Sequence, residues 1–438
     1  MSHAKSLVSD LIDFIDNSPS PWHAVSSTVA LLEADGFEQL EESEAWQLAE
    51  KGRYYVVRDQ SSLIAFINGA TSPTEAGFRI IGAHSDSPGL RVKPHPISEK
   101  GGWLRVGVEV YGGPILATFA DRDLSLAGRV SINSGEAVTD IESRLIKFDH
   151  PLLRLPNLAI HLNREVNEKG LKFNRQQELP LIFSLADNDN PKNNPRVLQQ
   201  LLADVLELDF EQILGWELAI YDTQKGAFWG KDELFFANSQ LDNLASCHAA
   251  LMALLHNLEH DPDATQVIAF FDHEEVGSES EKGADGSFLG DILKRICITQ
   301  GLSTEHYLRA LSQSTLMSAD MAHAWHPNFA DKHDAEHRPM INSGPVLKIN
   351  SNQRYTTQAN TEALFVKLCQ QQAIPYQKFI NRTDLSCGST IGPLTASKLG
   401  LSSFDVGNPM WSMHSIRESA GVLDHEYMLK LMRAFLLS

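Results

Sequence analysis

The spacing of apolar residues predicts a chain in which helices and strands alternate near both ends. Apolar residues between Leu7 and Ile15 recur at helical spacing and are interrupted by aspartates. This pattern indicates an amphipathic helix that stays on the protein, not a signal peptide. One long apolar helix is predicted at 241–260, and strands are predicted at 54–59, 61–69, 77–86, 265–272 and 344–350. Such alternation is typical of a parallel or mixed α/β sheet.

The middle of the chain has a different pattern. Residues 103–110 alternate between apolar and polar, and further short strands are predicted at 124–132, 143–149 and 157–162. A polar loop at 186–195 leads into one helix at 196–208. We therefore predict an α/β domain formed by residues 1–92 and 233–438, interrupted by a β-rich domain of residues 93–232. The alternative is one large α+β domain without an insertion.

Composition narrows the range of functions. The 438 residues include 56 acids and 37 bases, which give a formal net charge of -19. Nucleic acids and anionic membranes need a basic surface, so we expect neither as a partner. No apolar run reaches transmembrane length. The four cysteines are scattered without a CxxC pair, which favours a reducing, cytoplasmic compartment.

Polar residues stand at the ends of two predicted apolar elements, a strand and a helix. His84 and Asp86 stand two residues apart at the end of a strand, so their side chains point the same way. A carboxylate so placed is suited to hold a metal-binding histidine. Asp242 lies in or near the first turn of the long helix, which Asn238 or Ser239 is expected to cap. Each residue also has a structural alternative. His84 and Asp86 can form a polar turn after the strand, and Asp242 can be a carboxylate that the helix dipole stabilises.

The segment FFDHEEVGSES, Phe270 to Ser280, is a stronger signal. An apolar strand leads directly into an aspartate, a histidine and the adjacent Glu274 and Glu275, and Gly277 permits a sharp turn. Catalytic groups of open α/β sheets lie beyond the carboxyl ends of such strands. Two adjacent side chains point in different directions, so one glutamate can bind a metal while the other acts as a general base. The alternative is a solvated acidic loop.

Five dispersed residues form a candidate ligand set. Asp320 and His414 are weak signals by themselves, but they join His84, Asp242 and Glu275 in offering oxygen and nitrogen ligands suited to a pair of divalent metal ions. Two divalent ions, three carboxylates and one hydroxide sum to zero charge, as a buried site requires. The sequence therefore predicts a two-metal site.

Two rival motifs are weaker. The segment HDAEH, residues 333–337, fits an H-x-x-E-H zinc motif that needs a helix, yet Pro327 and Pro339 bracket it and no apolar stripe supports a helix. The segment LSCGSTIGP places Cys387 among hydroxyls and glycines, but no base can be assigned to a nucleophile there. A loop that lines a pocket is the expected role of the second segment.

Seven segments, in order and over nearly the whole chain, resemble the M18 metalloaminopeptidases, the aspartyl aminopeptidase family. They are GAHSDSPG, SQLDNLASC, FFDHEEVGS, SADMAHAWHPN, GPVLKINSNQRYTT, CGSTIGP and SMHSIRE. The resemblance implies a phosphopeptidase-like α/β sandwich with an inserted β-rich dimerisation domain. It also implies two zinc ions per subunit, with Mn²⁺ or Co²⁺ as substitutes, and a homo-oligomer that is a tetrahedral dodecamer.

The same resemblance implies roles for the candidate ligands. Asp242 would bridge the two zinc ions. His84 and Asp320 would complete one metal site, and Glu275 and His414 the other. Which terminal ligand serves which ion stays open.

The resemblance also implies a reaction, the hydrolysis of the N-terminal peptide bond of small peptides. Glu274 would take a proton from the attacking water and deliver it to the leaving amine, and Asp86 would support the metal centre. His161 would reach a neighbouring subunit's active site, where it would contact substrate or metal. Lys348 would face an acidic side chain, which predicts a preference for N-terminal Asp or Glu. The alternative for Lys348 is a surface lysine that closes a strand, and the alternative specificity is a neutral or leucine preference. A separate alternative, from another class of function, is a non-catalytic, metal-stabilised binding or assembly protein.

Overall fold

The computed structural model describes residues 1–189 and 191–438, which form a mixed α/β protein. Its contacts divide the chain into two units. Unit 1 comprises residues 1–86, 226–413 and 418–438, and unit 2 comprises residues 87–225 and 414–417. The mixed α/β fold class is confirmed. The predicted boundaries at 92 and 233, and the role of the inserted domain in assembly, stay predictions. Residue 190 of the predicted loop at 186–195 lies outside the described residues.

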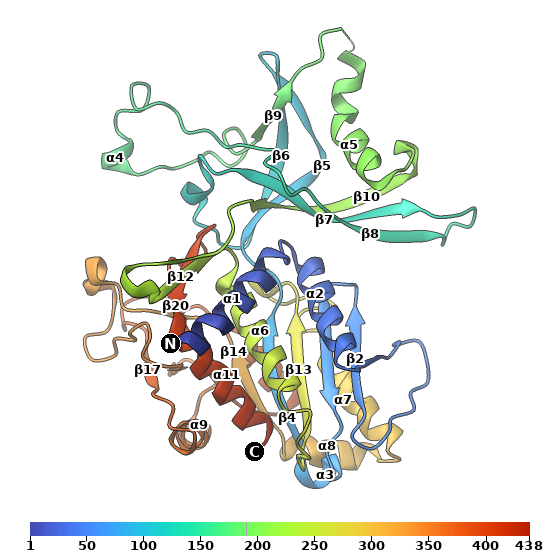
Figure 1. Ribbon diagram of the computed structural model, residues 1–438, viewed down its shortest axis with the longest axis vertical. Coiled ribbons are helices and arrows are strands. Elements are labelled where there is room, and N and C mark those ends of the chain that lie inside the picture. Colours follow the sequence, from blue (N-terminus) through green and yellow to red (C-terminus); the bar gives the residue numbers. More distant parts are fainter. Residues whose placement is uncertain (190) are drawn as a thin grey trace. The chain divides into compact units, whose positions relative to one another are not determined.

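Unit 1 is built around a nine-stranded sheet (Figure 1). In spatial order its strands are β1 (Glu38–Gln39), β2 (Arg53–Arg58), β3 (Ser62–Ile67), β13 (Thr265–Phe271), β4 (Phe78–His84), β14 (Thr315–Ala319), β18 (Ser402–Gly407), β16 (Val346–Lys348) and β17 (Gln377–Phe379). The neighbours β13, β4, β14 and β18 are parallel. The strands predicted at both ends of the chain are confirmed as β2, β3, β4, β13 and β16.

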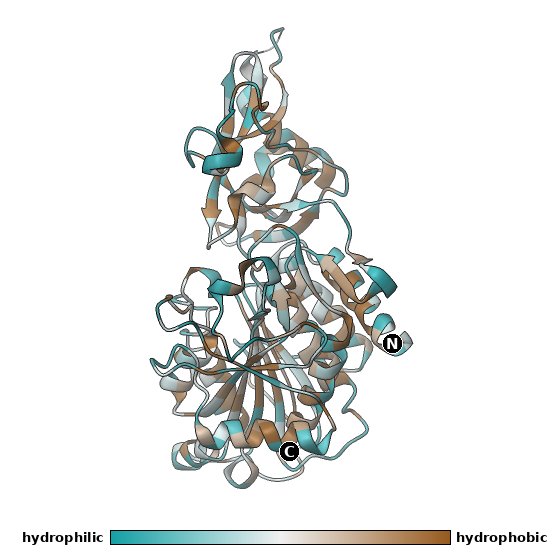
Figure 2. Ribbon diagram, turned by 90° about the vertical axis from the view of Figure 1, so that its left-hand side faces the viewer, coloured by the Kyte–Doolittle hydropathy of each residue, from teal (hydrophilic) through white to brown (hydrophobic). Residues whose placement is uncertain are grey.

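Alternate residues of the central strands pack into two separate cores. On β13, Ile268 and Phe270 join one core, and Val267, Ala269 and Phe271 join the other, because successive side chains of a strand point to opposite faces. The first core includes α1 (Ser2–Asp16), α2 (Pro21–Ala34), α6 (Leu241–Leu255), α9 (Ala359–Gln371) and α11 (Val422–Leu436). The second includes α7 (Phe288–Thr299), α8 (Thr304–Ser312) and α10 (Ile391–Leu399). Burial on both faces explains the continuous apolar runs of these strands (Figure 2).

A smaller, five-stranded sheet also belongs to unit 1. In spatial order it consists of β11 (Ala227–Trp229), β12 (Phe235–Asn238), β20 (Glu418–Gly421), β19 (Pro409–Trp411) and β15 (Ala322–His323). The short helix α3 (Pro73–Ala76) precedes β4. The predicted capping of the long helix by Asn238 or Ser239 is wrong. Asn238 ends β12, so the chain turns after it, and α6 begins at Leu241 with the left-handed Gln240 at its N-cap position.

Unit 2 contains a six-stranded antiparallel sheet. In spatial order its strands are β8 (Ile141–Lys147), β7 (Leu124–Asn133), β10 (Ile213–Asp222), β5 (Gly89–Lys100), β6 (Trp103–Tyr111) and β9 (Leu181–Leu185). The unit also contains α4 (Val166–Lys169) and α5 (Val197–Leu206). On β6 the alternation predicted for residues 103–110 is confirmed, since Leu104, Val106 and Val108 are buried and Val110 packs against the core that includes Val106 and Val108.

The strand predicted at 157–162 is wrong. This segment is a loop, and its apolar residues Leu158, Ile160 and Leu162 are exposed. Alternation produces a strand only where one face of the segment is buried. Here the alternating side chains pack against no core. Within the part of the chain that the structure describes, no helix has both the length and the apolar character needed to cross a bilayer.

Candidate metal centre

The candidate site lies at the carboxyl ends of three adjacent parallel strands. His84 is the last residue of β4, and its register partner on β13 is Phe271. Asp272, Glu274 and Glu275 follow β13, and Asp320 follows β14 directly. Parallel strands bring their carboxyl ends to one edge of the sheet, where open α/β proteins bind ligands. The topology therefore places side chains from three distant segments at one edge of the sheet.

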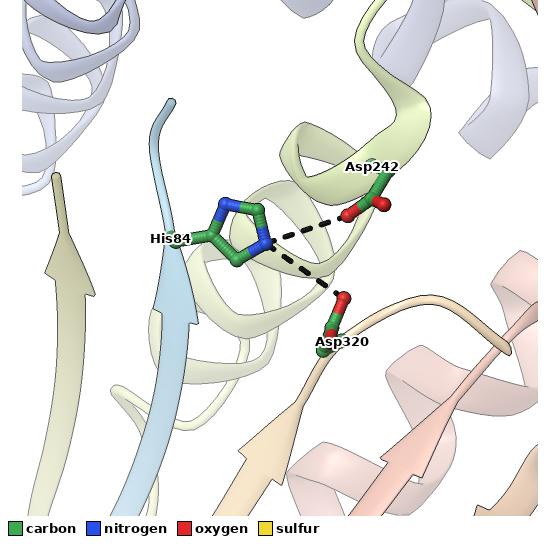
Figure 3. Close-up of side chains that lie close together, drawn as sticks. All are labelled: His84, Asp242 and Asp320. Carbon is green, nitrogen blue, oxygen red and sulfur yellow. Dashed lines mark ion pairs between the residues drawn. The ribbon is translucent and has the colours of Figure 1, made fainter. Parts of the chain in front are cut away.

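His84 is the meeting point of these side chains (Figure 3). Its Nε2 lies 3.4 Å from Oδ1 of Asp242 and 3.7 Å from Oδ1 of Asp320. The three ligand atoms form one compact group, and ligand atoms of His84, Glu274 and Glu275 form a second. His84 is only 1% exposed, so this edge of the sheet holds several acids around a buried imidazole.

Asp86 connects the histidine to the two glutamates. Its Oδ1 lies 3.3 Å from Nδ1 of His84. The same carboxylate accepts the backbone N–H groups of Glu274 and Glu275, each at 3.2 Å. The two glutamates are half-buried in a single 3₁₀ turn, Glu274–Val276. A carboxylate in this position fixes the ring of His84 and the backbone of that turn together.

Residues that the sequence reasoning missed hold Asp242 in place. The backbone N–H of Asp242 donates to the buried carboxylate of Glu418 at 3.0 Å. The side-chain amide of Asn243 donates to the carbonyl of Ala319 at 2.8 Å, which links the start of α6 to the end of β14. Glu418 follows His414 closely in the sequence and was noted only as part of a motif. Its long-range contact left no signal in the local pattern.

The glutamate turn is shaped by Asp272 and His273, to which sequence reasoning gave no role. Asp272 is buried and accepts the backbone N–H of His273 at 2.8 Å. His273 has a left-handed backbone, and its Nδ1 lies 2.9 Å from the hydroxyl of Ser280. Lys282 lies 3.8 Å from Asp272 and also contacts Asp59. These contacts fold the loop after β13 back on itself and hold both glutamates at the sheet edge.

Burial and mutual repulsion perturb the acids and the histidine. Burial by itself would lower the pKa of His84, but the carboxylates of Asp242, Asp320 and Asp86 outweigh it and raise the pKa well above its usual range. Burial raises the pKa of Glu274 to about 8, against the opposing effect of His84. Burial and the charge of Asp242 raise the pKa of Glu275 well above its usual range. Such a cluster needs compensating positive charge.

The donor set fits zinc. Imidazole nitrogen and carboxylate oxygen are the ligands of catalytic zinc sites, and His84, Asp242 and Asp320 offer them from buried positions within one compact group. When no cation is bound, bound protons neutralise part of the negative charge of these carboxylates. A divalent cation would do so more completely, because it meets several carboxylates at once. The residues of this edge therefore suit zinc binding.

Lys348 lies beside the cluster. It is 2% exposed, and its Nζ is 3.3 Å from Oδ2 of Asp320. The same ammonium lies over the ring of Tyr355, 5.3 Å from its centroid. The alternative of a surface lysine that closes a strand is therefore wrong. Tyr355, which the sequence reasoning did not select, forms part of the wall around Lys348.

The two remaining candidates belong to unit 2. His161 is exposed in the loop that follows residue 156. His414 has a left-handed backbone, and its Nδ1 lies 3.1 Å from the carbonyl of Gly113 in the same unit. Unit 1 thus brings together seven of the nine predicted site residues. The roles of His161 and His414 stay predictions.

The rival zinc motif has no helix to support it. Residues 333–337 follow the 3₁₀ element Pro327–Lys332 and form turns. His337 Nδ1 bonds to Asp334 at 2.8 Å, inside the motif itself. The glycine-rich segment around Cys387 is a loop before α10, and Cys387 packs against the small core that contains Tyr355.

Comparisons with known proteins agree with one another. A family model described as "Aminopeptidase I zinc metalloprotease (M18)" matches residues 14–436. The "Probable M18 family aminopeptidase 2" of Pseudomonas aeruginosa strain UCBPP-PA14 is 49% identical over 426 residues, which cover 97% of this chain and 96% of that protein.

Two solved structures extend this likeness to the fold. A chain in the cryo-EM structure of the Ape4 and Nbr1 complex has a TM-score of 0.95 and 39% identity, and the match covers 99% of this chain and 86% of that one. A chain of the S. cerevisiae mApe1 dodecamer has a TM-score of 0.85 and 27% identity, and the match covers 99% and 97%.

Proposed function

The chain belongs to the M18 family of zinc metalloaminopeptidases, and from this membership we propose that it removes the N-terminal residue of small peptides at a two-zinc site. The observation that carries the proposal is the convergence of His84, Asp242 and Asp320 at one sheet edge, with Glu274 and Glu275 in the adjoining turn. Metal ligands and a candidate base therefore stand side by side.

Five residues would hold the metals. Asp242 would bridge the two ions, with His84 and Asp320 on one and Glu275 and His414 on the other. Bound zinc would supply Lewis-acid polarisation of the scissile carbonyl and would lower the pKa of the attacking water. Mn²⁺ or Co²⁺ would serve as substitutes.

Glu274 would move the protons of the reaction. Its backbone is fixed by Asp86, and its elevated pKa of about 8 marks a site where a proton is readily held. A general base must reach the water that attacks, and it must later return the proton to the leaving amine. Glu275 shares the turn but would serve as a ligand. The adjacency thus places a ligand and a base one residue apart.

Lys348 would set the preference for the first residue. A buried ammonium beside the metal ligands offers a partner for the carboxylate of an N-terminal Asp or Glu. Lys348 already contacts Asp320, so the substrate carboxylate would share it. The alternative is a neutral or leucine preference, in which Lys348 serves Asp320 alone.

We also propose a homo-oligomer, a dodecamer, in which His161 contacts substrate or metal of a neighbouring subunit. A relative of known structure is described as a dodecamer. The exposed apolar residues Leu158, Ile160 and Leu162 flank His161 in the same loop, and exposed apolar clusters of this kind mark interaction sites. Sedimentation velocity would test the assembly.

A panel of N-terminal aminoacyl peptides, assayed with measured metal content, tests the proposed function. We expect hydrolysis that chelation abolishes and zinc restores, with Glu and Asp substrates cleaved fastest. Equal rates for Glu and Leu substrates would contradict the acidic preference but not the reaction. No hydrolysis before chelation or after metal restoration would instead favour a non-catalytic, metal-stabilised protein.

A further inference from the structure

A second concave site lies in unit 1, outside the ligand cluster. It is a pocket of about 310 Å³. Phe379, Met410 and Trp411, from the ends of β17 and β19, contribute apolar wall, together with Leu385 and Met413 from loops. The rim is polar and comes from the loops that follow β15 and β17. No residue of this pocket was among the predicted site residues.

Two structural links place this pocket beside the candidate centre. Its residue His323 is the last of β15, three residues after Asp320. Phe379 is the register partner of Lys348 on the adjacent parallel strand, so the two side chains lie on the same face of the sheet. Lys348 itself lies 3.3 Å from Asp320. The pocket therefore begins one strand beyond the residue proposed to receive the first side chain.

The charges on the rim of the pocket are already matched. Arg382 donates to Asp384 through Nε at 2.7 Å and Nη2 at 3.0 Å. Nζ of Lys332 lies 3.6 Å from Asp331. Asp334 is bonded to His337 at 2.8 Å. This rim differs from the surroundings of Lys348, a buried ammonium that lies 3.3 Å from Asp320 of the acid cluster.

His333 on the rim does not add a positive charge. Nε2 of His333 accepts the backbone N–H of His326 at 3.2 Å, which requires that nitrogen to carry no proton. Burial and the neighbouring His326 lower the pKa of His333. A charged ligand group near Arg382, Lys332 or Asp334 would thus meet a side chain that already has a partner, whereas an apolar group would meet Phe379, Trp411 and Leu385.

We propose that this pocket binds the side chain of the substrate's second residue and selects large apolar or aromatic side chains there. The inference rests on the proposed peptidase function. An extended peptide advances by about 3.3–3.6 Å per residue, so a substrate whose first side chain lies at Lys348 presents its next residues to the neighbouring strand. The specificity would then be split, with an acidic first residue and an apolar second residue.

Peptides of the form Glu-X-Gly-Gly, with Phe, Leu, Gly or Asp as X, test the proposal with the zinc-loaded full chain. Burial of a Phe side chain is expected to raise kcat/KM about tenfold or more over Gly, and Asp should fall at or below Gly. The same series with Leu in the first position separates the two pockets, because the order at X should persist if the acidic preference is wrong.

Leu385→Asp is the informative variant, because Leu385 lines the pocket from a loop and is 45% exposed. We expect the ratio of kcat/KM for Phe over Gly to fall toward one. Leu308→Asp is the matched control, since Leu308 is 60% exposed on α8 and does not line the pocket. It should keep the wild-type ratio. A flat series in the wild-type protein, or equal loss of the ratio in both variants, would overturn the proposal.

A binding measurement keeps the inference separate from the reaction. Calorimetry with the chelated protein compares the dissociation constants of Gly-Phe-Gly and Gly-Gly-Gly, which differ only in the second residue. We expect the Phe peptide to bind about tenfold more tightly, and Leu385→Asp to remove that difference. If no peptide were hydrolysed, the proposed function would fail, and this comparison would still show whether the pocket binds an apolar side chain. Equal constants in the wild-type protein would overturn the inference.

Discussion

Unit 1 contains two kinds of buried acid, and they differ in what surrounds them. Asp405 on β18 is fully buried. Its Oδ2 accepts two hydrogen bonds from Thr356, one from the backbone N–H at 2.6 Å and one from the side-chain hydroxyl at 2.8 Å. Its other oxygen accepts the hydroxyl of Thr390. Asp424 on α11 accepts the backbone N–H groups of Asn342 at 2.6 Å and Gly344 at 2.8 Å. Neutral donors supplied by the fold surround both carboxylates.

The acids of the candidate centre are surrounded by other acids. Asp242 and Asp320 both approach Nε2 of His84, and Glu274 and Glu275 stand in the adjoining turn. Burial and the charges of the neighbouring acids raise the pKa values of Glu274 and Glu275. Burial alone therefore does not identify a functional acid. The crowding of several carboxylates around one buried imidazole is what suits this cluster to a cation.

The largest effect expected from this comparison is that of Asp242→Ala. This change removes the proposed bridge, so we expect zinc content to fall to background and turnover to fall by on the order of a thousandfold or more. Plasma emission spectrometry and a peptide assay on the same sample check both. Full zinc occupancy in the variant would remove Asp242 from the bridge.

Zinc uptake should depend on pH. His84, Glu274 and Glu275 all have pKa values raised in the metal-free protein, that of Glu274 to about 8, so the site holds protons near neutrality. Zinc must displace these protons, and its affinity should therefore rise as pH rises toward the pKa of Glu274. Calorimetry in buffers of different ionisation enthalpy counts the protons released. Uptake without proton release would contradict the compensation that we infer.

The contrasting acid should affect stability and leave metal binding intact. Asp405→Ala leaves the donors of Thr356 and Thr390 unsatisfied, which costs about 1–3 kcal/mol for each buried polar group left without a partner. Urea denaturation measures the loss, and the folded variant should retain the wild-type zinc content. If zinc were lost while the folded fraction stayed high, Asp405 would belong with the ligand cluster.

The smallest expected effect concerns the pH dependence of stability. Burial raises the pKa of Asp424 to about 7 from 3.8, although backbone N–H groups oppose the shift. The folded state thus binds the proton of Asp424 more tightly than the unfolded state does. The resulting stabilisation of the folded state is complete below about pH 4 and is lost as the pH rises through about 7. Asp424→Asn lacks this titration, so the stability difference from wild type should shrink between about pH 4 and 7. A difference independent of pH would contradict the shift.

The sequence predicted the sheet edge better than its surroundings. Continuous apolar runs predicted β4 and β13, and parallel strands necessarily bring His84 and the glutamates to one edge. Other contacts of the site join residues far apart in the chain. The backbone N–H of Asp242 donates to Glu418, and the carboxylate of Asp86 accepts two backbone N–H groups of the glutamate turn. No local pattern encodes such contacts. The wrong strand at 157–162 shows the converse error, since alternation is read locally whereas burial is decided by the whole fold.

Sequence also could not separate the two kinds of acid. Asp405 follows Phe404 on β18, and Asp272 follows Phe271 at the end of β13; both aspartates are buried. Only the positions of Thr356 and Thr390, 49 and 15 residues away from Asp405 in the chain, show that its carboxylate has neutral partners. The pocket lined by Phe379 and Trp411 escaped prediction for the same reason, because its wall comes from three separate strands.

The central claim is that Glu274 and Glu275, one residue apart, perform different chemistry. Glu274→Gln and Glu275→Gln, measured side by side for zinc content and turnover, test it most directly. We expect Glu274→Gln to keep wild-type zinc content and to lose about 10²–10⁴ in kcat, the usual contribution of a general acid–base. Glu275→Gln should lose zinc as well as turnover. Retained turnover in Glu274→Gln, or the same zinc loss in both variants, would contradict the division of roles.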